Sequence, residues 1–311
     1  MSSHKSCFHV HLGHGVGNRM FQYASVRGMA ETIGFNFNVL ENTIDSEHNN
    51  KTYDWFKQRI DNDANETDVH YDSNNHWLMY HQSDLEHIGH HTNLERFKDL
   101  ENNIIRPVNV VMNGYFQCED NFDNIRQKLS DILSTESNYI TEKLDLLEVK
   151  LAKNLRTCVA IHIRLGDYLI KTNHLVKLQR YYEKCISHMR NQLGTDGPIH
   201  FIIVCEDPEN IAKVYPNLLD FIQTRDTYSM LNVCRESLLI NDADAVEFDM
   251  YLIARCRGAI CSNSTFSWWA SWIGLNRVTT DSKIVCIPNQ WIHFSDACIK
   301  MKNATVVDVD E

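Results

Sequence analysis

His162, Arg164 and Asp167 close an apolar, strand-like run, and their types and spacing suggest chemistry at the end of that strand. Side chains two residues apart share one face of a strand, so His162 and Arg164 point the same way. Open α/β sheets bind ligands beyond the carboxyl ends of their strands, and a planar guanidinium can hold two oxygens of a diphosphate. The run therefore indicates an anion site at Arg164. Taken alone, it is equally consistent with a surface arginine beside a Gly-Asp turn.

Two further segments place a loop between a strand and a helix. Residues 8–12 are largely apolar, residues 13–17 carry three glycines, and a helical pattern follows. Late in the chain, residues 258–261 indicate a buried strand and residues 262–265 a loop with a capping residue. The helix expected after this loop runs from Phe266 to Gly274 and ends at the glycine.

Together the three segments resemble the α-1,2-fucosyltransferase family, which is glycosyltransferase family 11. Residues 162–168 match its His-x-Arg-x-Gly-Asp-Tyr element, and residues 13–24 are similar to its Gly-x-Gly-Asn-Gln-Met-Phe-Gln-Tyr-Ala element. Residues 263–269 match its Asn-Ser-Thr-Phe-Ser-Trp-Trp element, and residues 114–118 are similar to its Gly-Tyr-Phe-Gln-Ser element. All four occur in the family's order over nearly the whole chain, which is more specific than any one of them.

Two positions depart from the family pattern. Leu165 stands where the family usually has a second arginine, which leaves Arg164 to carry the phosphate contact without its neighbour. Arg19 stands where glutamine is usual, in the loop that the resemblance places near the sugar.

The resemblance implies roles for the residues around the donor nucleotide. Arg164 would meet the diphosphate and stabilise the charge that develops on the departing GDP. His162 would contact the nucleotide, with a core histidine as the alternative, and Asp167 would either bind ligand or only cap its loop. Ser264 and Thr265 open a helix whose free N–H groups suit an anion, although simple N-capping explains them equally well from sequence alone.

Further ligand contacts are implied elsewhere in the chain. Asp249 is expected in the first turn of its helix, where it either favours the helix dipole or, as in related fucosyltransferases, faces the guanine base. Asn18 is implied to act at the fucose and the acceptor as a catalytic residue. Gly15 and Gly17 lie beside Asn18 in the same loop, and glycine allows the backbone to approach a ligand closely. The matched elements add four substrate-binding residues, Gly15, Gly17, Gln22 and Asn263.

Length, charge and cysteine usage narrow the class of protein. A chain of 311 residues with 43% hydrophobic content has room for about two domains with cores of their own. A net charge of −11 argues against a nucleic-acid partner, whose phosphates require a basic face. No segment approaches the ~20 apolar residues that span a bilayer. The ten cysteines show no paired spacing and are read as reduced, among them four in strand-like runs: Cys158, Cys205, Cys261 and Cys286.

The order of apolar runs indicates two domains. Residues 122–153 form a long, charged, helix-like segment that would end a first domain near residue 155. From residue 157 onward strands alternate with helices, which predicts a parallel sheet with right-handed crossovers. We therefore expect an α/β fold with two domains, residues 1–155 and residues 156–311, facing each other across a cleft. The resemblance implies that the first is the acceptor-side domain and that the second is a GDP-fucose-binding, Rossmann-like domain. The resemblance implies the same GT-B-like architecture.

The reaction implied is the transfer of L-fucose from GDP-β-L-fucose to the 2-hydroxyl of a glycan acceptor, a terminal galactose, with inversion. No metal or other cofactor is expected. The Asp-x-Asp strings at residues 61–63, 242–244 and 308–310 lie in polar or terminal stretches or cap a helix. Glu119 and Asp120 are candidates for the base that accepts the proton. A GDP-sugar-binding or lectin-like protein that has lost transfer is the alternative function.

The sequon at Asn263 bears on cellular location. It falls inside the expected donor loop, where a glycan would block the site. This favours a cytoplasmic enzyme, with a truncated or anchored enzyme of the Golgi lumen as the alternative.

Overall fold

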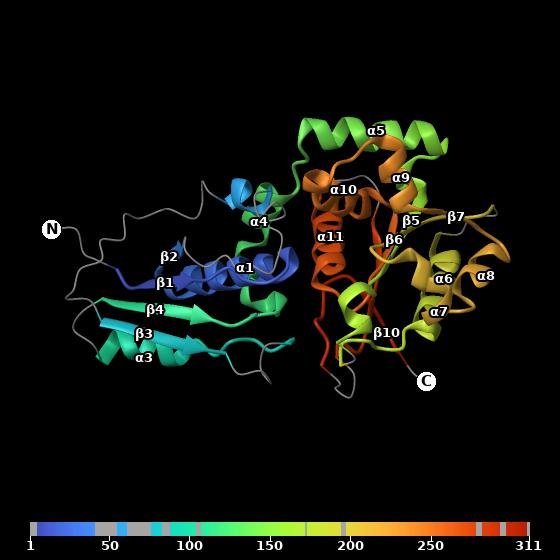
Figure 1. The fold of residues 1–311 in the computed structure, drawn as a ribbon. Coiled ribbons are helices and arrows are strands. Elements are labelled where there is room, and N and C mark those ends of the chain that lie inside the picture. Colours follow the sequence, from blue (N-terminus) through green and yellow to red (C-terminus); the bar gives the residue numbers. More distant parts are fainter. Residues whose placement is uncertain are drawn as a thin grey trace. The chain divides into compact units, whose positions relative to one another are not determined.

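The chain forms two compact units, Met1–Leu133 and Ser134–Glu311, and each contains one parallel β-sheet (Figure 1). The computed structural model describes residues 5–40, 55–60, 76–82, 88–103, 107–171, 173–193, 197–277, 282–292 and 297–309. The expected α/β fold class, with two Rossmann-type units, is confirmed.

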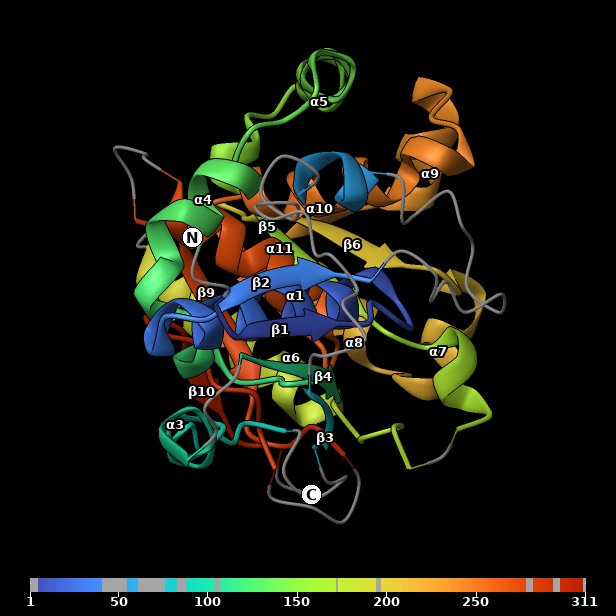
Figure 2. The same ribbon diagram turned by 90° about the vertical axis from the view of Figure 1, so that its left-hand side faces the viewer.

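The first unit is built on a four-stranded sheet. Its named elements are β1 (Cys7–Val10), α1 (Val16–Ile33), β2 (Asn36–Val39), β3 (His76–His81), α3 (Glu95–Asn103), β4 (Val108–Asn113), the 3-10 turns η1 (Glu119–Asn121) and η2 (Asp123–Ile125), and α4 (Arg126–Leu133). The strand order is β2-β1-β4-β3, which can be followed in Figure 2. All four residues of β1 are buried because the strand lies inside the sheet and packs against α1.

The second unit is built on a six-stranded sheet of order β10-β9-β8-β5-β6-β7. Its elements are α5 (Asn138–Leu151), η3 (Leu155–Thr157), β5 (Cys158–Ile163), η4 (Gly166–Leu169), α6 (Gln179–Leu193), β6 (His200–Cys205), η5 (Pro208–Asn210), α7 (Ile211–Val214), α8 (Leu218–Gln223), β7 (Thr227–Met230), α9 (Leu231–Leu238), α10 (Asp242–Arg255), β8 (Gly258–Ile260), α11 (Thr265–Asn276), β9 (Ile284–Pro288) and β10 (Thr305–Val307). All six residues of β5 are buried, as expected for a parallel strand covered on both faces. In Figure 1, α10 and α11 lie on one side of this sheet and α6 to α8 on the other.

The long helix expected over residues 122–153 is instead two helices, α4 and α5, with a break between them. Ser137 ends the break as the N-cap of α5, because its Oγ accepts a hydrogen bond from the Ile140 N–H at 3.3 Å. Glu247 of α10 in turn accepts hydrogen bonds from the Ser137 N–H at 3.2 Å and from its Oγ at 3.3 Å. The division between the units therefore falls in this break, at Leu133, and α5 packs on α10 and α9 of the second unit. The boundary expected at residue 155 would have assigned α5 to the first unit.

Two expectations about helices of the second unit were wrong in detail. Helix α10 begins at Asp242, so Asp249 lies well inside it and not in its first turn. Helix α11 continues past Gly274 to Asn276. A Cβ on Gly274 would lie 2.7 Å from the Ala254 carbonyl oxygen, so this glycine allows close packing of α10 on α11 and does not end the helix.

The core contains the cysteines and tryptophans of the second unit. Trp268, Trp269 and Trp272 are fully buried, with ring centroids 5.1 and 5.2 Å apart in sequence order. All ten cysteines are free thiols, and nine of them are buried. The four cysteines expected in the core are buried as predicted: Cys158, Cys205, Cys261 and Cys286.

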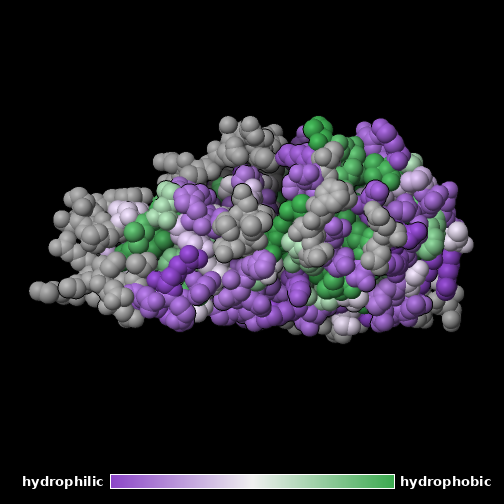
Figure 3. Space-filling view, turned by 90° about the horizontal axis from the view of Figure 1, so that it is seen from below, coloured by the Kyte–Doolittle hydropathy of each residue, from purple (hydrophilic) through white to green (hydrophobic). Residues whose placement is uncertain are grey.

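The face of the molecule in Figure 3 is covered mainly by hydrophilic residues, in keeping with the net charge of −11. Among the residues that the structure describes, no helix has both the length and the hydropathy to cross a membrane.

Candidate active site

The topology of the second sheet marks a ligand site at the carboxyl ends of β5 and β8. From β5 the chain adds β6 and β7 on one side, and then returns to add β8, β9 and β10 on the other. Open α/β sheets bind ligands where the strand order reverses in this way, because the two loops leave the edge in opposite directions. The sequence element at 162–168 begins with the last two residues of β5, and two residues separate the element at 263–269 from the end of β8.

His162 joins the two strands at this point. Its Nδ1 lies 2.8 Å from the Ser262 Oγ, and its backbone oxygen accepts a hydrogen bond from the Tyr182 hydroxyl at 3.0 Å. Burial, with the positive charge of Arg164 as a smaller cause, lowers the pKa of His162 to about 3. A neutral, buried imidazole bonded to Ser262 favours the core-histidine interpretation over a contact with the nucleotide.

Arg164 lies beyond the end of β5 and is held by two carboxylates. Its Nη2 donates to Asp167 Oδ1 at 2.6 Å, and its Nη1 lies 3.0 Å from Glu206 Oε1. Burial disfavours the charged guanidinium, but the negative charges of Glu206 and Asp167 outweigh it and raise the pKa of Arg164. One third of the side chain remains exposed, at 33%. Arg164 is thus a fixed, permanently charged group that solvent or ligand can reach.

Gly166 makes this arrangement possible. Its φ of +34° lies in the left-handed region, and a Cβ there would approach Glu206 Oε1 to 2.6 Å. The glycine of the His-x-Arg-x-Gly-Asp-Tyr element therefore leaves room for the second carboxylate on Arg164.

Asp167 orients Arg164 in this structure. Its other oxygen, Oδ2, accepts from Lys171 Nζ at 3.2 Å, so both carboxylate oxygens have basic partners. Burial raises the pKa of Asp167, but the charges of Arg164 and Lys171 outweigh it and the net shift is downward.

Glu206 was missed by the sequence reasoning. Glu206 directly follows β6, as Arg164 directly follows β5. A polar residue immediately after a buried strand was therefore the available signal. Its partner could not be read from the sequence because the contact depends on β6 lying beside β5.

The two departures from the family pattern both face the protein interior. Leu165 is fully buried in the hydrophobic core of the second unit. Arg19 is 2% exposed within α1 of the first unit. Leu165 offers no cation to a ligand, so Arg164 is the guanidinium of this element.

The loop after β8 is held rigidly by Asn263. Its Nδ2 donates to the His174 oxygen at 2.8 Å and to the Trp291 oxygen at 2.9 Å, and its own carbonyl accepts from the Tyr168 hydroxyl at 3.2 Å. Asn263 is 2% exposed, so its amide shapes the loop and is not presented to solvent.

Helix α11 begins immediately after this loop. Ser264 occupies its N-cap position in extended conformation, but its side chain makes no capping hydrogen bond, and Thr265 is the first helical residue. The absence of a cap at Ser264 favours the anion-site alternative over simple N-capping, because first-turn N–H groups of a helix suit negative charge.

Asp249 lies in α10 as a buried carboxylate with incomplete partners. Its side chain is 15% exposed, Oδ2 lies 3.5 Å from Arg235 Nη1, and Oδ1 is buried without a hydrogen bond to any described residue. Burial raises the pKa of Asp249 to about 7, opposed by Arg235 and assisted by Glu206. A buried carboxylate with a raised pKa lowers the stability of the fold. Carboxylates of this kind are typical of binding sites.

The first unit forms a second loop cluster, where the residues after β1 and β4 meet. Gln22 Oε1 accepts from the Gly13 N–H at 2.9 Å, and Gln22 Nε2 donates to the Gly114 oxygen at 3.1 Å. Asn18 Oδ1 accepts from Gln117 Nε2 at 2.8 Å. The first and fourth sequence elements are therefore neighbours, and Gln22 acts here as a positioning residue.

The glycines of this cluster leave open space. A Cβ on Gly13 or Gly15 would meet nothing within 4 Å. Gly15 is the N-cap of α1, and Gly17 and Asn18 lie in the first turn of that helix. Of the two candidate bases, Glu119 is buried and paired with Arg126, whereas Asp120 is exposed.

No group of three or more His, Cys, Asp or Glu side chains is placed to hold a metal within the described ranges. Asp242 and Asp244 lie in the first turn of α10, where Asn241 Oδ1 caps the Ala243 N–H at 2.9 Å and the Asp244 N–H at 3.0 Å. The strings at residues 61–63 and 308–310 lie wholly or partly outside the described residues.

Comparison with protein families decides the class of the chain. The model of glycosyl transferase family 11 matches residues 1–293. The chain belongs to glycosyl transferase family 11. The family expected from the four sequence elements is therefore confirmed.

Two relatives of this family 11 chain come from Escherichia coli. The O-antigen biosynthesis glycosyltransferase WbnK is 26% identical over 184 residues, which cover 57% of this chain and 54% of that protein. An alpha-1,2-colitosyltransferase is 25% identical over 182 residues, with coverages of 57% and 54%. The chain spans about half the length of the curated relatives it matches.

The family 11 chain also aligns with two solved structures. POFUT1 in complex with GDP-fucose aligns with a TM-score of 0.48 and 11% identity, covering 90% of this chain and 97% of that chain. NodZ alpha-1,6-fucosyltransferase soaked with GDP-fucose aligns with a TM-score of 0.42 and 12% identity, covering 87% and 94%.

Proposed function

We propose that this chain is an inverting fucosyltransferase that moves L-fucose from GDP-β-L-fucose to the 2-hydroxyl of a terminal galactose on a glycan acceptor. The observation that carries the proposal is the fixed guanidinium of Arg164 at the β5–β8 reversal, in a chain that belongs to glycosyl transferase family 11.

The donor diphosphate would bind between Arg164 and the start of α11. A guanidinium and the N–H groups of a helix terminus neutralise a diphosphate in complementary ways, one by a charged fork and the other by backbone donors. The Ser264 hydroxyl makes no capping hydrogen bond to helix α11, which supports this placement of the diphosphate. Because these groups supply the positive charge, we propose transfer without a metal.

The guanine base would contact Asp249. A carboxylate accepts from both the guanine N1–H and its exocyclic amine, and uracil offers no such pair of donors. The Oδ1 atom of Asp249, buried without a hydrogen bond to a described residue, supports a ligand that completes its hydrogen bonding.

The proposed chemistry is a single displacement at the anomeric carbon. A base takes the proton of the acceptor hydroxyl, the acceptor oxygen bonds to the anomeric carbon, and the bond to the diphosphate breaks with its electron pair leaving on GDP. Attack on the face opposite the β-linked GDP gives an α-linked product. Asn18 is proposed to act at the sugar and acceptor, with Gly15 and Gly17 allowing close approach, and the exposed Asp120 is the preferred base.

The name of one relative, an alpha-1,2-colitosyltransferase, supports the linkage and raises a second donor sugar. A colitosyl donor would use the same nucleotide contacts, so it belongs in the same assay. We also propose a cytoplasmic location, supported by the free cysteines and by Asn263, whose buried amide leaves no room for a glycan.

The alternative function, a GDP-sugar-binding or lectin-like protein without transfer, is raised by the two departures from the family pattern, Leu165 and Arg19. Incubation with GDP-fucose, alone and with a panel of galactosides, decides between them. An enzyme should give an α-1,2-fucosylated product by NMR and slow donor hydrolysis without acceptor. An intact donor in both arms would show a binder, and an α-1,3 or α-1,6 product would refute the linkage.

A further inference from the structure

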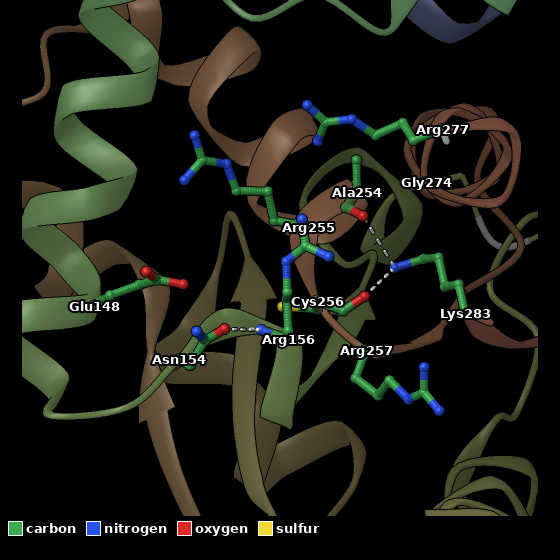
Figure 4. Close-up of a pocket in the computed structure, with 10 residues that line it drawn as sticks. All are labelled: Glu148, Asn154, Arg156, Ala254, Arg255, Cys256, Arg257, Gly274, Arg277 and Lys283. Carbon is green, nitrogen blue, oxygen red and sulfur yellow. Dashed lines mark hydrogen bonds between the residues drawn. The ribbon is translucent and has the colours of Figure 1, made fainter. Parts of the chain in front are cut away.

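A second basic site lies at the opposite edge of the second sheet. A pocket of about 400 Å³ is lined by five cations and one acid, with only small or backbone groups besides (Figure 4). Its lining cations are Arg156, Arg255, Arg257, Arg277 and Lys283, and its acid is Glu148. In a chain with a net charge of −11, five cations in one pocket call for an explanation.

The sheet topology gathers three of these cations. The neighbouring strands β9, β8 and β5 are each preceded by a basic residue: Lys283 directly before β9, Arg257 directly before β8, and Arg156 within η3 just before β5. Because parallel strands start at the same edge, these side chains share the amino edge of the sheet. The Arg164 site lies at the carboxyl edge, so the two sites are separate.

The carboxyl end of helix α10 accounts for the positive charge of Lys283. Lys283 Nζ donates to the carbonyls of Ile253 and Cys256, both at 2.6 Å, at the carboxyl end of α10. Such a cation is favoured by the unpaired carbonyls and the dipole of the helix.

Arg255 and Arg277 both pair with one acid. Glu136 Oε1 lies 3.0 Å from Arg255 Nε and 2.6 Å from Arg277 Nη2. The acid in the pocket is occupied as well, since Glu148 Oε1 accepts from the Leu155 N–H at 2.7 Å.

Among the described residues, neither a bond to the carbonyls of a helix end nor an ion pair accounts for the positive charge of Arg156. Within the described part of the chain its side chain makes no hydrogen bond or ion pair, and it is exposed. Figure 4 shows it extending from the start of β5 toward Arg255, with Lys283 entering from another side and the Arg257 side chain running away from Arg156. A guanidinium held out into a pocket of like charges is unfavourable without an anion to share.

We propose that this pocket binds a phosphate-bearing anion with two or more negative charges, held mainly by Arg156, with the other cations that line the pocket around it. A planar guanidinium can contact two phosphate oxygens, and several around one pocket suit a diphosphate better than a single negative charge. The pocket offers almost no apolar side chain for an acyl chain to cover, which favours a water-soluble anion over a lipid headgroup. The site is independent of the fucosyltransferase function proposed above.

Binding of inorganic pyrophosphate at constant ionic strength tests the proposal. Because pyrophosphate could also occupy Arg164, calorimetric titrations use the full chain with Arg164→Ala as background. We expect saturable binding there, weakened at least about tenfold by Arg156→Gln with Arg257→Gln, the scale of one lost charge-assisted contact. Arg225→Gln removes another exposed arginine of the second unit that does not line the pocket, and it should change affinity less than about twofold.

Three results would overturn the proposal: no pyrophosphate binding in the Arg164→Ala background, an equal loss in the Arg225 control, or binding to phosphatidylglycerol vesicles that depends on Arg156 but that pyrophosphate does not displace. Should the double variant fail to fold, as judged by circular dichroism, Arg156→Lys takes its place. It keeps the charge and loses the fork, so weaker pyrophosphate binding supports the bidentate contact, and unchanged binding refutes it.

Discussion

Arg164 is the residue on which the donor site depends, and its neighbours fix it before any ligand arrives. Asp167 and Glu206 hold its two terminal nitrogens, and Leu165 beside it is buried. A fixed charge aimed at the leaving group needs no reorganisation during the reaction, which is the condition under which such groups accelerate transfer most. A diphosphate must compete with Glu206 for Nη1 of Arg164. The affinity for the donor therefore reflects the difference between the free energies with which Arg164 binds the diphosphate and the Glu206 carboxylate.

Arg164→Lys is therefore expected to be nearly as damaging as Arg164→Ala. Both should lower kcat/KM for GDP-fucose at least ~100-fold, as removal of one transition-state donor does, because a lysine cannot make the bidentate contact and Leu165 supplies no second cation. Steady-state kinetics with Arg225→Gln as surface control measure this. Retention of most activity by the lysine variant would mean that the contact is only a diffuse charge.

Asp249 should make donor binding depend on pH. With its pKa raised to about 7, the carboxylate is largely protonated at pH 6 and largely ionised at pH 8. Only the ionised form accepts from both guanine donors, so GDP affinity should rise as pH increases through 7. Asp249→Asn should lose this dependence and weaken binding by about 1–3 kcal/mol. Calorimetric titrations at several pH values test this, with Asp220→Asn, at an exposed position of α8, as control.

The same variant should be more stable than the parent chain. An aspartate whose folded pKa lies above its unfolded value of about 3.9 destabilises the fold progressively as pH rises from about 4 to about 7. At pH 8 Asp249→Asn should therefore raise the free energy of unfolding, by at most about 4 kcal/mol for a shift of this size. Unfolding in urea at pH 5 and pH 8 measures the difference. Weaker GDP binding with no gain in stability at pH 8 would contradict the account of Asp249 as a strained, buried carboxylate.

At the scale of elements, the sequence predicted the second unit well because its signals are local. The buried strand runs predicted β5 and β8 nearly as observed. What failed were properties that depend on neighbours. The break before α5 is fixed by Ser137 bonding to Glu247, more than a hundred residues later. Gly274 resembled a helix end, but close packing against α10 accounts for it.

The candidate active site shows the same difference between local sequence signals and contacts that depend on neighbouring elements. Arg164, Ser264 and Asn18 could be proposed because a strand end or helix start is visible in a short window. Glu206 and Ser262 could not be joined to Arg164 and His162, because those contacts require knowing that β6 and β8 flank β5. Strand order is a property of the whole sheet, and local periodicity does not specify it.

Gly274→Ala tests the close packing of α10 on α11. The added methyl would lie 2.7 Å from the Ala254 carbonyl oxygen, and a backbone atom in a packed helix cannot move aside easily. Overpacking of this kind costs about 1–3 kcal/mol and should outweigh the gain of up to about 1 kcal/mol from replacing glycine in a helix. Urea unfolding should therefore show a less stable protein. Gly197→Ala, where the added carbon meets nothing within 4 Å, should be close to neutral; an equal loss there would refute the packing argument.

For the molecule as a whole, the proposed reaction requires no metal because Arg164 and the start of α11 carry the positive charge. Treatment with EDTA should leave the transfer rate nearly unchanged. Dialysed enzyme assayed with and without added manganese supplies the measurement. A loss of about tenfold or more, restored by manganese, would show that a cation takes part in stabilising the departing diphosphate, an effect worth at least ~1.4 kcal/mol.

The division at Leu133 makes a prediction about which piece of the chain folds by itself. A fragment of residues 134–311 retains α5 and Glu136, whose two arginine partners lie in α10 and directly after α11. A fragment of residues 156–311 loses the apolar face of α5 and leaves Arg255 and Arg277 without that buried acid. Removing one partner of a buried ion pair costs about 3–5 kcal/mol, a large part of the stability of an ordinary domain. The longer fragment should unfold cooperatively in urea and the shorter one should not, and equal stability of the two would place the boundary near residue 155 after all.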